Sequence, residues 1–224
     1  MKVLIGIQAR LNSKRLPKKV MKKVNGNPLL FYVIERLKKT KLNDKIYVLT
    51  SYEESDLMIT EYCEEKKINI FRGDLNNVFS RYIEFVKEKN IDAVIRISAD
   101  SPLIDFNLVN TMYDLFLHNS EYDLITNVFP RTFPIGQSVE IVKSSTFHNL
   151  NQNKLQPDER EHVTSFIYKN PKLFRILNHK NFKNQSSVRL SIDNENDFSN
   201  FKNFVKENNN FINYTLEKIL DKWR

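Results

Sequence analysis

Residues 3–19 read VLIGIQARLNSKRLPKK, an apolar run followed directly by a basic loop. The run from Val3 to Ile7 is short and apolar throughout, as is typical of a strand buried on both faces of a parallel sheet. Ligands of open parallel sheets bind beyond the carboxyl ends of the strands, so we expect this loop to lie where a nucleotide polyphosphate would bind. A solvated basic turn is the alternative interpretation of such a cluster. The cations of the loop are Arg10, Lys14, Arg15, Lys18 and Lys19.

The rest of the chain alternates apolar runs with amphipathic stretches. Strands are predicted at 45–50, 68–71 and 92–97, and helices at 28–37, 53–67, 76–89 and 105–118. This alternation predicts an α/β fold, a Rossmann-like three-layer α/β/α sandwich with a mostly parallel sheet. Beyond residue 122 the alternation loosens. There we expect strands at 123–126, 139–142, 174–178 and 187–192, and helices at 160–168, 197–206 and 215–223.

Length and composition limit the class of protein. A chain of 224 residues with 41% hydrophobic residues can build one sizeable core, and we expect a single domain over residues 1–224. No apolar run approaches the roughly 20 residues that span a bilayer, and no targeting segment is visible, so the expected location is cytoplasmic. Cys63 is the only cysteine. That excludes an intramolecular disulfide and a zinc site built on several cysteines, and we expect a buried structural thiol.

Two later segments place an aspartate where a predicted strand ends. Residues 96–103 read RISADSPL and put Asp100 just past the strand at 92–97. Residues 189–198 read RLSIDNENDF and put Asp193 at the end of another predicted strand. On residue chemistry alone, Asp100 could form a turn and Asp193 could cap the following helix. A role as ligands is the alternative for both.

Three more segments carry polar residues in distinctive patterns. They read RGDLNNVFSRY at 72–82, RTFPIGQSVE at 131–140 and EREHVT at 159–164. Gly73 allows a tight strand-to-helix turn, and Asp74 either caps the helix or contacts a ligand. Arg81 is either a surface residue or points into the same cleft. His162 alone would be interpreted as structural, and the remaining histidines as surface or loop residues.

These six segments, in this order, resemble the motifs of the cytidylyltransferases that activate acidic sugars. The group includes CMP-sialic acid synthetases, 3-deoxy-manno-octulosonate cytidylyltransferases and the spore-coat polysaccharide biosynthesis (SpsF-type) proteins. The resemblance extends from residue 4 to about 198. Six positions depart from the family pattern: Lys18 replaces Gly, Asn77 and Ser138 replace Asp, and Asn194, Glu195 and Asn196 replace Thr, Pro and Glu.

The resemblance implies a site made of three parts. The nucleotide would be bound by Gln8, Ala9, Arg10, Ser13, Arg15, Lys19, Gly73, Asp74, Arg81 and Ser98. The acceptor would be bound by elements inserted at about 127–180, through Arg131, Pro134, Gly136, Glu140, Arg160 and His162. Mg²⁺ would be held by Asp100 and Asp193, and the catalytic residues would be Arg10, Arg15, Lys19 and Asp100.

The expected activity is Mg²⁺-dependent transfer of CMP from CTP to a sugar acid, or to a related small acidic or phosphorylated acceptor, with release of pyrophosphate. An anionic oxygen of the acceptor attacks the α-phosphorus in line, so the protein mainly positions the substrates and neutralises charge. Mg²⁺ suits this task because it binds one or two carboxylates together with phosphate oxygens. Surface glycan biosynthesis and a homodimer are further implications of the resemblance. GTP in place of CTP stays open.

Two other classes of protein are alternatives. The net charge of +8 also fits a nucleic-acid-binding protein. Against that class, the cations converge at a strand end and no known nucleic-acid-binding module is present, so we expect neither a nucleic-acid nor a membrane partner. A dinucleotide-dependent oxidoreductase needs a Gly-x-Gly-x-x-Gly turn after the first strand, and this sequence lacks it.

Overall fold

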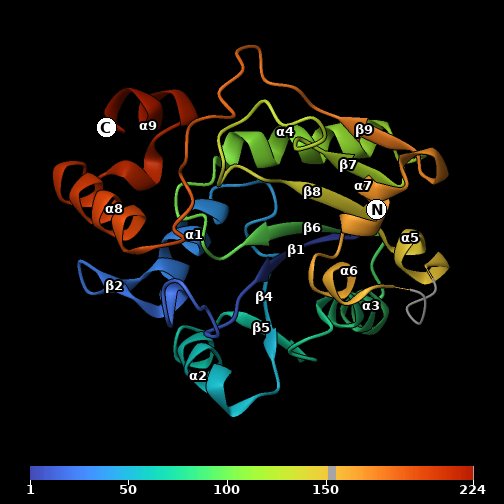
Figure 1. The fold of residues 1–224 in the computed structure, drawn as a ribbon, viewed down its shortest axis with the longest axis horizontal. Helices are drawn as coiled ribbons and strands as arrows, with labels where there is room; N and C mark the ends of the chain where they lie inside the picture. The colour runs from blue at the N-terminus through green and yellow to red at the C-terminus, as the bar shows by residue number, and fades with distance from the viewer. Residues whose placement is uncertain (151–154, 224) are drawn as a thin grey trace.

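A computed structural model of the chain describes residues 1–150 and 155–223. Its centre is a seven-stranded sheet with the order β5-β4-β1-β6-β8-β7-β9 (Figure 1). Strands β5, β4, β1 and β6 are parallel, β8 is antiparallel to β6 and β7, and β7 is parallel to β9. The strands are β1 (Val3–Gln8), β4 (Ile46–Ser51), β5 (Asn69–Gly73), β6 (Ala93–Ser98), β7 (Leu124–Thr126), β8 (Glu140–Lys143) and β9 (Ile176–Asn178).

Helices cover both faces of this sheet. Successive side chains of β1 point to opposite faces, so Ile5 and Ile7 belong to one apolar cluster and Leu4 to the other. The first cluster receives α1 (Leu29–Leu37), α2 (Leu57–Glu65), α4 (Phe106–His118), α8 (Glu195–Glu207) and α9 (Leu216–Lys222). The second receives α3 (Val78–Lys89), α5 (Ser144–Asn149) and α7 (Ser165–Lys169), and α6 (Pro157–Glu161) packs on α3. Figure 1 shows α3, α5 and α6 on one side and α1, α8 and α9 on the other. The predicted three-layer α/β/α sandwich is confirmed.

Short elements complete the described chain. A hairpin joins β2 (Lys23–Val24) to β3 (Asn27–Pro28) through Asn25 and Gly26, whose φ values are 46° and 80°. Positive φ at both central residues is the mark of a tight type I′ turn. The 3₁₀ helices are η1 (Lys19–Met21), η2 (Glu54–Asp56), η4 (Pro171–Leu173) and η5 (Phe211–Asn213). Among residues 1–150 and 155–223, no helix is both long and apolar enough to cross a membrane.

The prediction of a strand at 187–192 is wrong. Only Arg189 makes an isolated bridge, and its partner is Ile135 in a loop rather than a strand of the sheet. The Ile135 amide donates to the Val188 carbonyl at 2.9 Å, and the Leu190 amide donates to the Ile135 carbonyl at 2.7 Å. The segment is therefore extended because it pairs with the loop at 131–137.

The prediction of one helix at 160–168 is also wrong. Residues 157–169 form two short helices, α6 and α7, separated at His162. His162 has φ −102° and ψ 77°, which ends α6. Thr164 then donates its hydroxyl to Glu140 of β8 at 2.8 Å, a contact that a continuous helix would have to accommodate. The other predicted elements form with shifted ends, and the first turn of the predicted helix at 53–67 is η2.

Candidate active site

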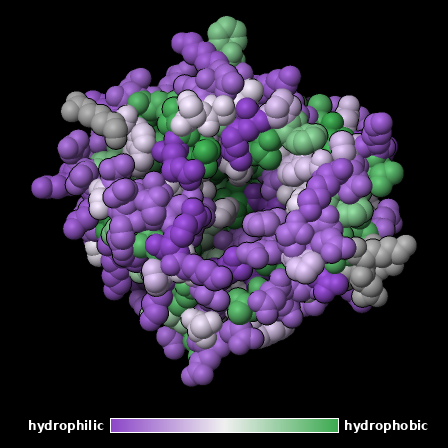
Figure 2. All heavy atoms as spheres, viewed as in Figure 1, coloured by the Kyte–Doolittle hydropathy of each residue, from purple (hydrophilic) through white to green (hydrophobic). Residues whose placement is uncertain are grey.

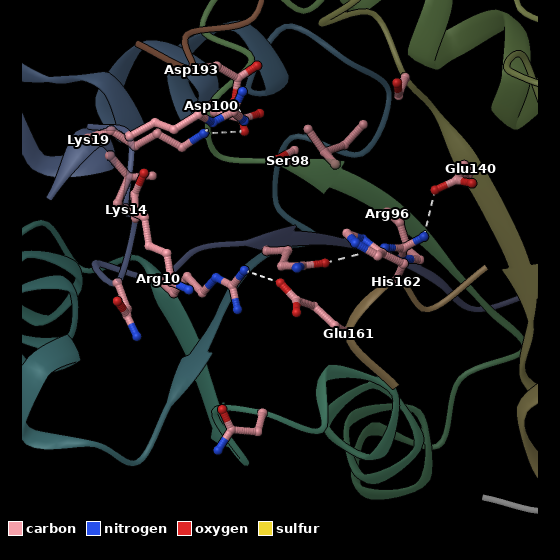
Figure 3. Close-up of a pocket in the computed structure, with 18 residues that line it drawn as sticks. Arg10, Lys14, Lys19, Arg96, Ser98, Asp100, Glu140, Glu161, His162 and Asp193 are labelled. Atoms are coloured by element: carbon pink, nitrogen blue, oxygen red, sulfur yellow. Dashed lines mark hydrogen bonds and ion pairs between the residues drawn. The ribbon is translucent and has the colours of Figure 1, made fainter. Parts of the chain in front are cut away.

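A polar cavity of about 780 Å³ opens at the carboxyl ends of β1 and β6. Gln8 and Ser98 are the last residues of these strands, pair in register and both line the cavity. Figure 2 shows this face of the molecule hollowed near its centre, with mostly hydrophilic residues around the rim. Its charged and titratable lining residues are Arg10, Lys14, Arg15, Lys19, Arg96, Asp100, Glu140, Glu161, His162 and Asp193 (Figure 3).

Lys19 joins the two predicted metal ligands. Its ammonium Nζ lies 2.7 Å from Oδ2 of Asp100 and 3.0 Å from Oδ1 of Asp193. The two aspartates are 93 positions apart in the sequence, but the Ile192 amide donates to the Asp100 carbonyl at 2.8 Å and fixes their segments together. Burial lowers the pKa of Lys19, but hydrogen bonds and charges from both aspartates outweigh burial and raise it overall. The ammonium group of Lys19 is therefore held in its charged form.

The carboxylate pair fits a small divalent cation. Both side chains already converge on one cationic group, the Lys19 ammonium. Within the described parts of the chain, no cluster of three or more His, Cys, Asp or Glu side chains could hold a metal ion. A metal at this place would therefore take two protein carboxylates and complete its shell with phosphate oxygens and water, which is how Mg²⁺ is typically bound.

Asp193 does not cap the helix that follows it. Asn194 is the N-cap of α8, and its side chain forms a reciprocal capping box with Asp197. The side chain of Asp193 is therefore free for the site, where Arg15 contacts its Oδ1 at 3.2 Å. Burial opposes ionisation, but the hydrogen bond and charge of Lys19 together with Ser191 and Arg15 lower the pKa of Asp193.

The basic loop is anchored by a buried carboxylate. Asp56 accepts the Leu11 amide at 2.7 Å and the Ser51 hydroxyl at 2.6 Å. Lys18 has φ 54°, the left-handed region that favours glycine, which explains why the family pattern has Gly at this position. Ser13 lines the cavity and accepts the Leu16 amide at 3.4 Å, whereas Ala9 is buried and does not line it.

Arg10 forms an ion pair with Glu161 across the cavity (Figure 3). Arg10 comes from the loop after β1, and Glu161 is the last residue of α6. The hydrogen bond and charge of Arg10 lower the pKa of Glu161. Sequence reasoning missed Glu161, although it stands inside the motif EREHVT. The neighbouring Arg160, predicted to bind the acceptor, does not line the cavity and donates instead to the Leu155 carbonyl at 3.2 Å.

A buried ion pair forms the wall of the cavity at β6 and β8. Arg96 and Glu140 are register partners, and Nη1 of Arg96 lies 2.6 Å from Oε2 of Glu140. Glu140 also accepts the hydroxyls of Thr164 and Tyr168, while Arg96 donates to the Gln8 side chain at 3.3 Å. Arg96 was missed in the sequence, although it opens the motif RISADSPL. The predicted acceptor residue Glu140 has both carboxylate oxygens engaged within the protein.

The expectations for the segment at 72–82 need correction. Arg81 is fully buried and donates to the backbone carbonyls of Asp74 and Leu49, so it neither lies on the surface nor faces the cavity. A Cβ at Gly73 would lie 2.6 Å from the Arg81 side chain, so this glycine makes room for the arginine. Asp74 accepts the amides of Asn76 and Asn77 in the turn, and the N-cap of α3 is Asn77. From this segment, the cavity is lined by Asn76.

The predicted acceptor residues at 131–140 divide in a similar way. Arg131 donates to the Ser138 hydroxyl at 2.9 Å and to the Pro134 carbonyl at 3.4 Å. Ser138 lines the cavity, as do Glu140 and His162, whereas Arg131, Pro134 and Gly136 do not. Gly136 has φ 97°, and a Cβ there would lie 2.5 Å from the Ser191 nitrogen. It is therefore a packing position for the segment that carries Asp193.

Comparisons of the sequence and of the structure both find known proteins similar to this chain. The cytidylyltransferase family model matches residues 4–219. Spore coat polysaccharide biosynthesis protein SpsF of Bacillus subtilis is 28% identical, over 89% of this chain and 85% of that protein. A cytidylyltransferase structure from Leptospira borgpetersenii is 33% identical with a TM-score of 0.93, over 99% of this chain and 93% of the other. A CMP:2-keto-3-deoxy-manno-octonic acid synthetase solved with CTP shares the fold, with a TM-score of 0.71 at 14% identity over 92% of this chain and 99% of the other.

Proposed function

The chain belongs to the cytidylyltransferase family, and on that premise we propose that it transfers CMP from CTP to a small acidic sugar, or to a related acidic or phosphorylated acceptor. The reaction depends on Mg²⁺ and releases pyrophosphate. The observation that carries the proposal is the convergence of Asp100 and Asp193 on Lys19 in the cavity at the carboxyl ends of β1 and β6. This arrangement combines a two-carboxylate cation site with a cationic loop of the kind that binds a triphosphate.

The reaction needs positioning and charge neutralisation more than covalent help from the protein. An acceptor oxygen forms a bond to the α-phosphorus, the bond from that phosphorus to the bridging oxygen breaks, and pyrophosphate leaves. Arg15 and Lys19 contact the aspartates, and Arg10 precedes them in the same loop. These cations offset the charge on the phosphates as the leaving group departs. A Mg²⁺ ion held by Asp100 and Asp193 supplies, when bound, further charge neutralisation at phosphate oxygens.

The opposite wall of the cavity suits the acceptor. Glu140 begins β8, Ser138 lies two residues before it, and His162 follows α6. Glu140 and His162 lie away from the two aspartates (Figure 3). Ser138 receives a hydrogen bond from Arg131, and Glu140 is fixed by Arg96. The SpsF relative is a spore coat polysaccharide biosynthesis protein, which supports a role in surface glycan synthesis. The synthetase of similar fold carries CTP in its structure, which supports CTP as the donor.

Thermal unfolding with CTP, GTP, UTP and ATP, each with Mg²⁺ or with EDTA, tests the proposal without knowledge of the acceptor. A ligand present at about a hundredfold over its Kd, and bound only by the native state, stabilises by roughly 2.7 kcal/mol. We expect CTP with Mg²⁺ to raise the Tm most. Selectivity for GTP would change the donor and keep the chemistry, and no response to any nucleotide would contradict the proposal.

Substitution in the basic loop provides the second arm of this test. Arg15→Ala removes a cation that contacts Asp193 and is 70% exposed, so the fold loses little. We expect weaker CTP binding by isothermal titration and an almost unchanged Tm. Arg175→Ala, which removes an exposed arginine paired with Asp123 at 3.5 Å, serves as the control. Unchanged CTP affinity in Arg15→Ala would show that the loop does not bind the triphosphate.

A further inference from the structure

We infer that Arg189 is a positioning residue that orients the Asp193 carboxylate for the cation site. The inference rests on the proposed function, because it concerns how Asp193 meets Mg²⁺ and nucleotide. Nη1 of Arg189 lies 2.9 Å from Oδ2 of Asp193. The Ser191 hydroxyl donates to the same oxygen at 3.1 Å.

The two oxygens of Asp193 face different partners. Oδ2 is engaged by Arg189 and Ser191, which belong to the same short segment as Asp193 itself. Oδ1 faces the cavity, with Lys19 at 3.0 Å and Arg15 at 3.2 Å. A carboxylate that is fixed through one oxygen cannot rotate freely about its last bond. Arg189 and Ser191 therefore keep Oδ1 pointed at the place where Oδ2 of Asp100 also converges.

The backbone of the segment that carries Arg189 is held from two sides, while the Arg189 side chain is 45% exposed. The Arg189 backbone bridges Ile135, and the close approach of Gly136 to Ser191 leaves no room for a side chain at that glycine. On the other side, the Asp193 amide donates to the Asp197 side chain at 2.8 Å, which ties the end of the segment to α8. The segment from 189 to 193 is therefore a rigid support between a loop and a helix.

The geometry favours an indirect role over direct phosphate binding. Arg189 is absent from the residues that line the cavity, whereas Arg15, on the other side of Asp193, is among them. Asp100 has a weaker support of this kind, since among the described contacts its Oδ1 receives only the Ser101 hydroxyl at 3.3 Å. Residues that orient metal ligands in this way typically contribute about 10- to 100-fold to metal affinity.

The test is titration of the full-length protein with CTP, once with saturating Mg²⁺ and once with EDTA. For Arg189→Ala we expect the gain in CTP affinity that Mg²⁺ provides to fall by roughly tenfold or more. CTP affinity in EDTA should change less than about twofold, because Arg189 does not line the cavity. Arg189→Lys, which keeps a donor for Oδ2, should restore much of the gain. Arg175→Ala should behave as the unaltered protein.

Two results would overturn the inference. An equal loss of CTP affinity in EDTA and in Mg²⁺ would show direct phosphate binding by Arg189. An unchanged Mg²⁺ gain in Arg189→Ala would show that Asp193 needs no such support. If Arg189→Ala unfolds, the same measurement on Arg189→Lys and Ser191→Ala decides, because Ser191→Ala should show a smaller loss of the same kind. Failure of the unaltered protein to bind CTP would instead contradict the proposed function, on which the inference depends.

Discussion

Lys19 donates its ammonium protons to two carboxylates, so it places a cation between Asp100 and Asp193. The side chains are 14%, 22% and 15% exposed. Breaking a buried ion pair is costly when it leaves one charge without a partner. Here the removal of either aspartate leaves Lys19 with the other one. Loss of one carboxylate therefore does not leave the Lys19 ammonium without a partner.

From this follows the first prediction, on Asp100→Asn and Asp193→Asn. Each change keeps the shape of the side chain and removes the charge that a divalent cation needs. We expect each variant to lose CTP turnover almost completely while its Tm shifts by only a few degrees. Pyrophosphate release with a productive acceptor measures turnover, and thermal unfolding measures the fold. Asp114→Asn, at an exposed carboxylate paired with Lys41, is the control. Near-normal turnover in either variant would remove that residue from the site.

The Arg10–Glu161 pair leads to a second prediction. A nucleotide phosphate that binds Arg10 has to replace or neighbour the Glu161 carboxylate, which carries the same sign of charge. Partly exposed ion pairs of this kind contribute about 0–1 kcal/mol, so Glu161→Gln should bind CTP roughly two- to fivefold more tightly. Isothermal titration measures the change. Asp158→Asn, at an exposed residue of the same helix α6, should have no effect. Weaker CTP binding by Glu161→Gln would show that the carboxylate contacts the nucleotide itself.

At the scale of single residues, the sequence predicts which residues have the right chemistry for the site better than it predicts which way their side chains point. Arg15, Lys19 and Asp100 follow β1 and β6, whose carboxyl ends meet at one edge of the sheet, and they line one cavity. Asp193 lines the same cavity but directly follows the extended segment at 187–192, which pairs with a loop. The motifs cannot show that Arg81 turns inward, because its direction depends on the backbone carbonyls of Asp74 and of Leu49 in β4. Likewise, the partner of Arg96 is Glu140, which lies 44 positions later in the sequence, and the partner of Arg10 is Glu161, which lies 151 positions later. Such partners are visible only in the folded chain.

At the scale of elements, the accuracy of prediction follows the length of the apolar pattern. The buried strands β1, β4 and β6 and the helices α3 and α4 carry long periodic runs, and they form where the pattern predicts them. The extended segment at 187–192 carries the same kind of run but pairs with a loop. Its state is decided by Ile135 and Gly136, more than 50 positions earlier. Local pattern contains no information about such a partner.

Gly136 therefore supports a third prediction, at the level of the loop it belongs to. An alanine there would adopt a φ near 97° and would place its Cβ 2.5–2.7 Å from backbone atoms of Leu190 and Ser191. Since that backbone cannot move without Asp193, Gly136→Ala should cost more than about 2 kcal/mol and should weaken CTP binding in Mg²⁺. Denaturant unfolding and titration measure the two effects.

A matched control comes from the β2–β3 hairpin. Gly26 also has a positive φ, of 80°, but a Cβ there would meet no atom within 4 Å. Gly26→Ala should therefore cost only the backbone strain, about 1 kcal/mol, and should leave CTP affinity unchanged. Equal effects of the two substitutions on CTP binding would show that Gly136 does not position the segment carrying Asp193.

At the scale of the whole molecule, the fold gathers charge that is scattered along the chain. The lining cations and carboxylates come from the loop after β1, from β6, from the segment around β8, from α6 and from the turn before α8. Much of this lining is paired within the protein, through Arg10–Glu161, Arg96–Glu140 and Lys19 with both aspartates. A polyphosphate ligand therefore has to rearrange existing ion pairs, which makes binding a property of the whole cavity rather than of one motif.

The reactivity of the single thiol can measure how ligand binding stabilises the whole fold. Cys63 lies on α2 with no exposed surface, packed in the larger apolar cluster. Burial, followed by the charge of Glu64, raises its pKa to about 12. Thiol reagents react with the thiolate, so burial and the raised pKa both suppress labelling of the folded chain at pH 8. In the unfolded chain the thiol regains an ordinary pKa and full access, so labelling at pH 8 measures opening of the fold.

The fourth prediction is that CTP with Mg²⁺ protects Cys63 although α2 does not line the cavity. At about a hundredfold over its Kd, the nucleotide should lower the unfolded population, and with it the labelling rate, by roughly 100-fold. A thiol reagent with optical readout at pH 8 gives the rate, and Asp193→Asn with the same nucleotide should lose most of the protection. If CTP raises the Tm but leaves the labelling rate unchanged, Cys63 is exposed by local opening of α2, and the site and this helix are not part of one cooperative unit.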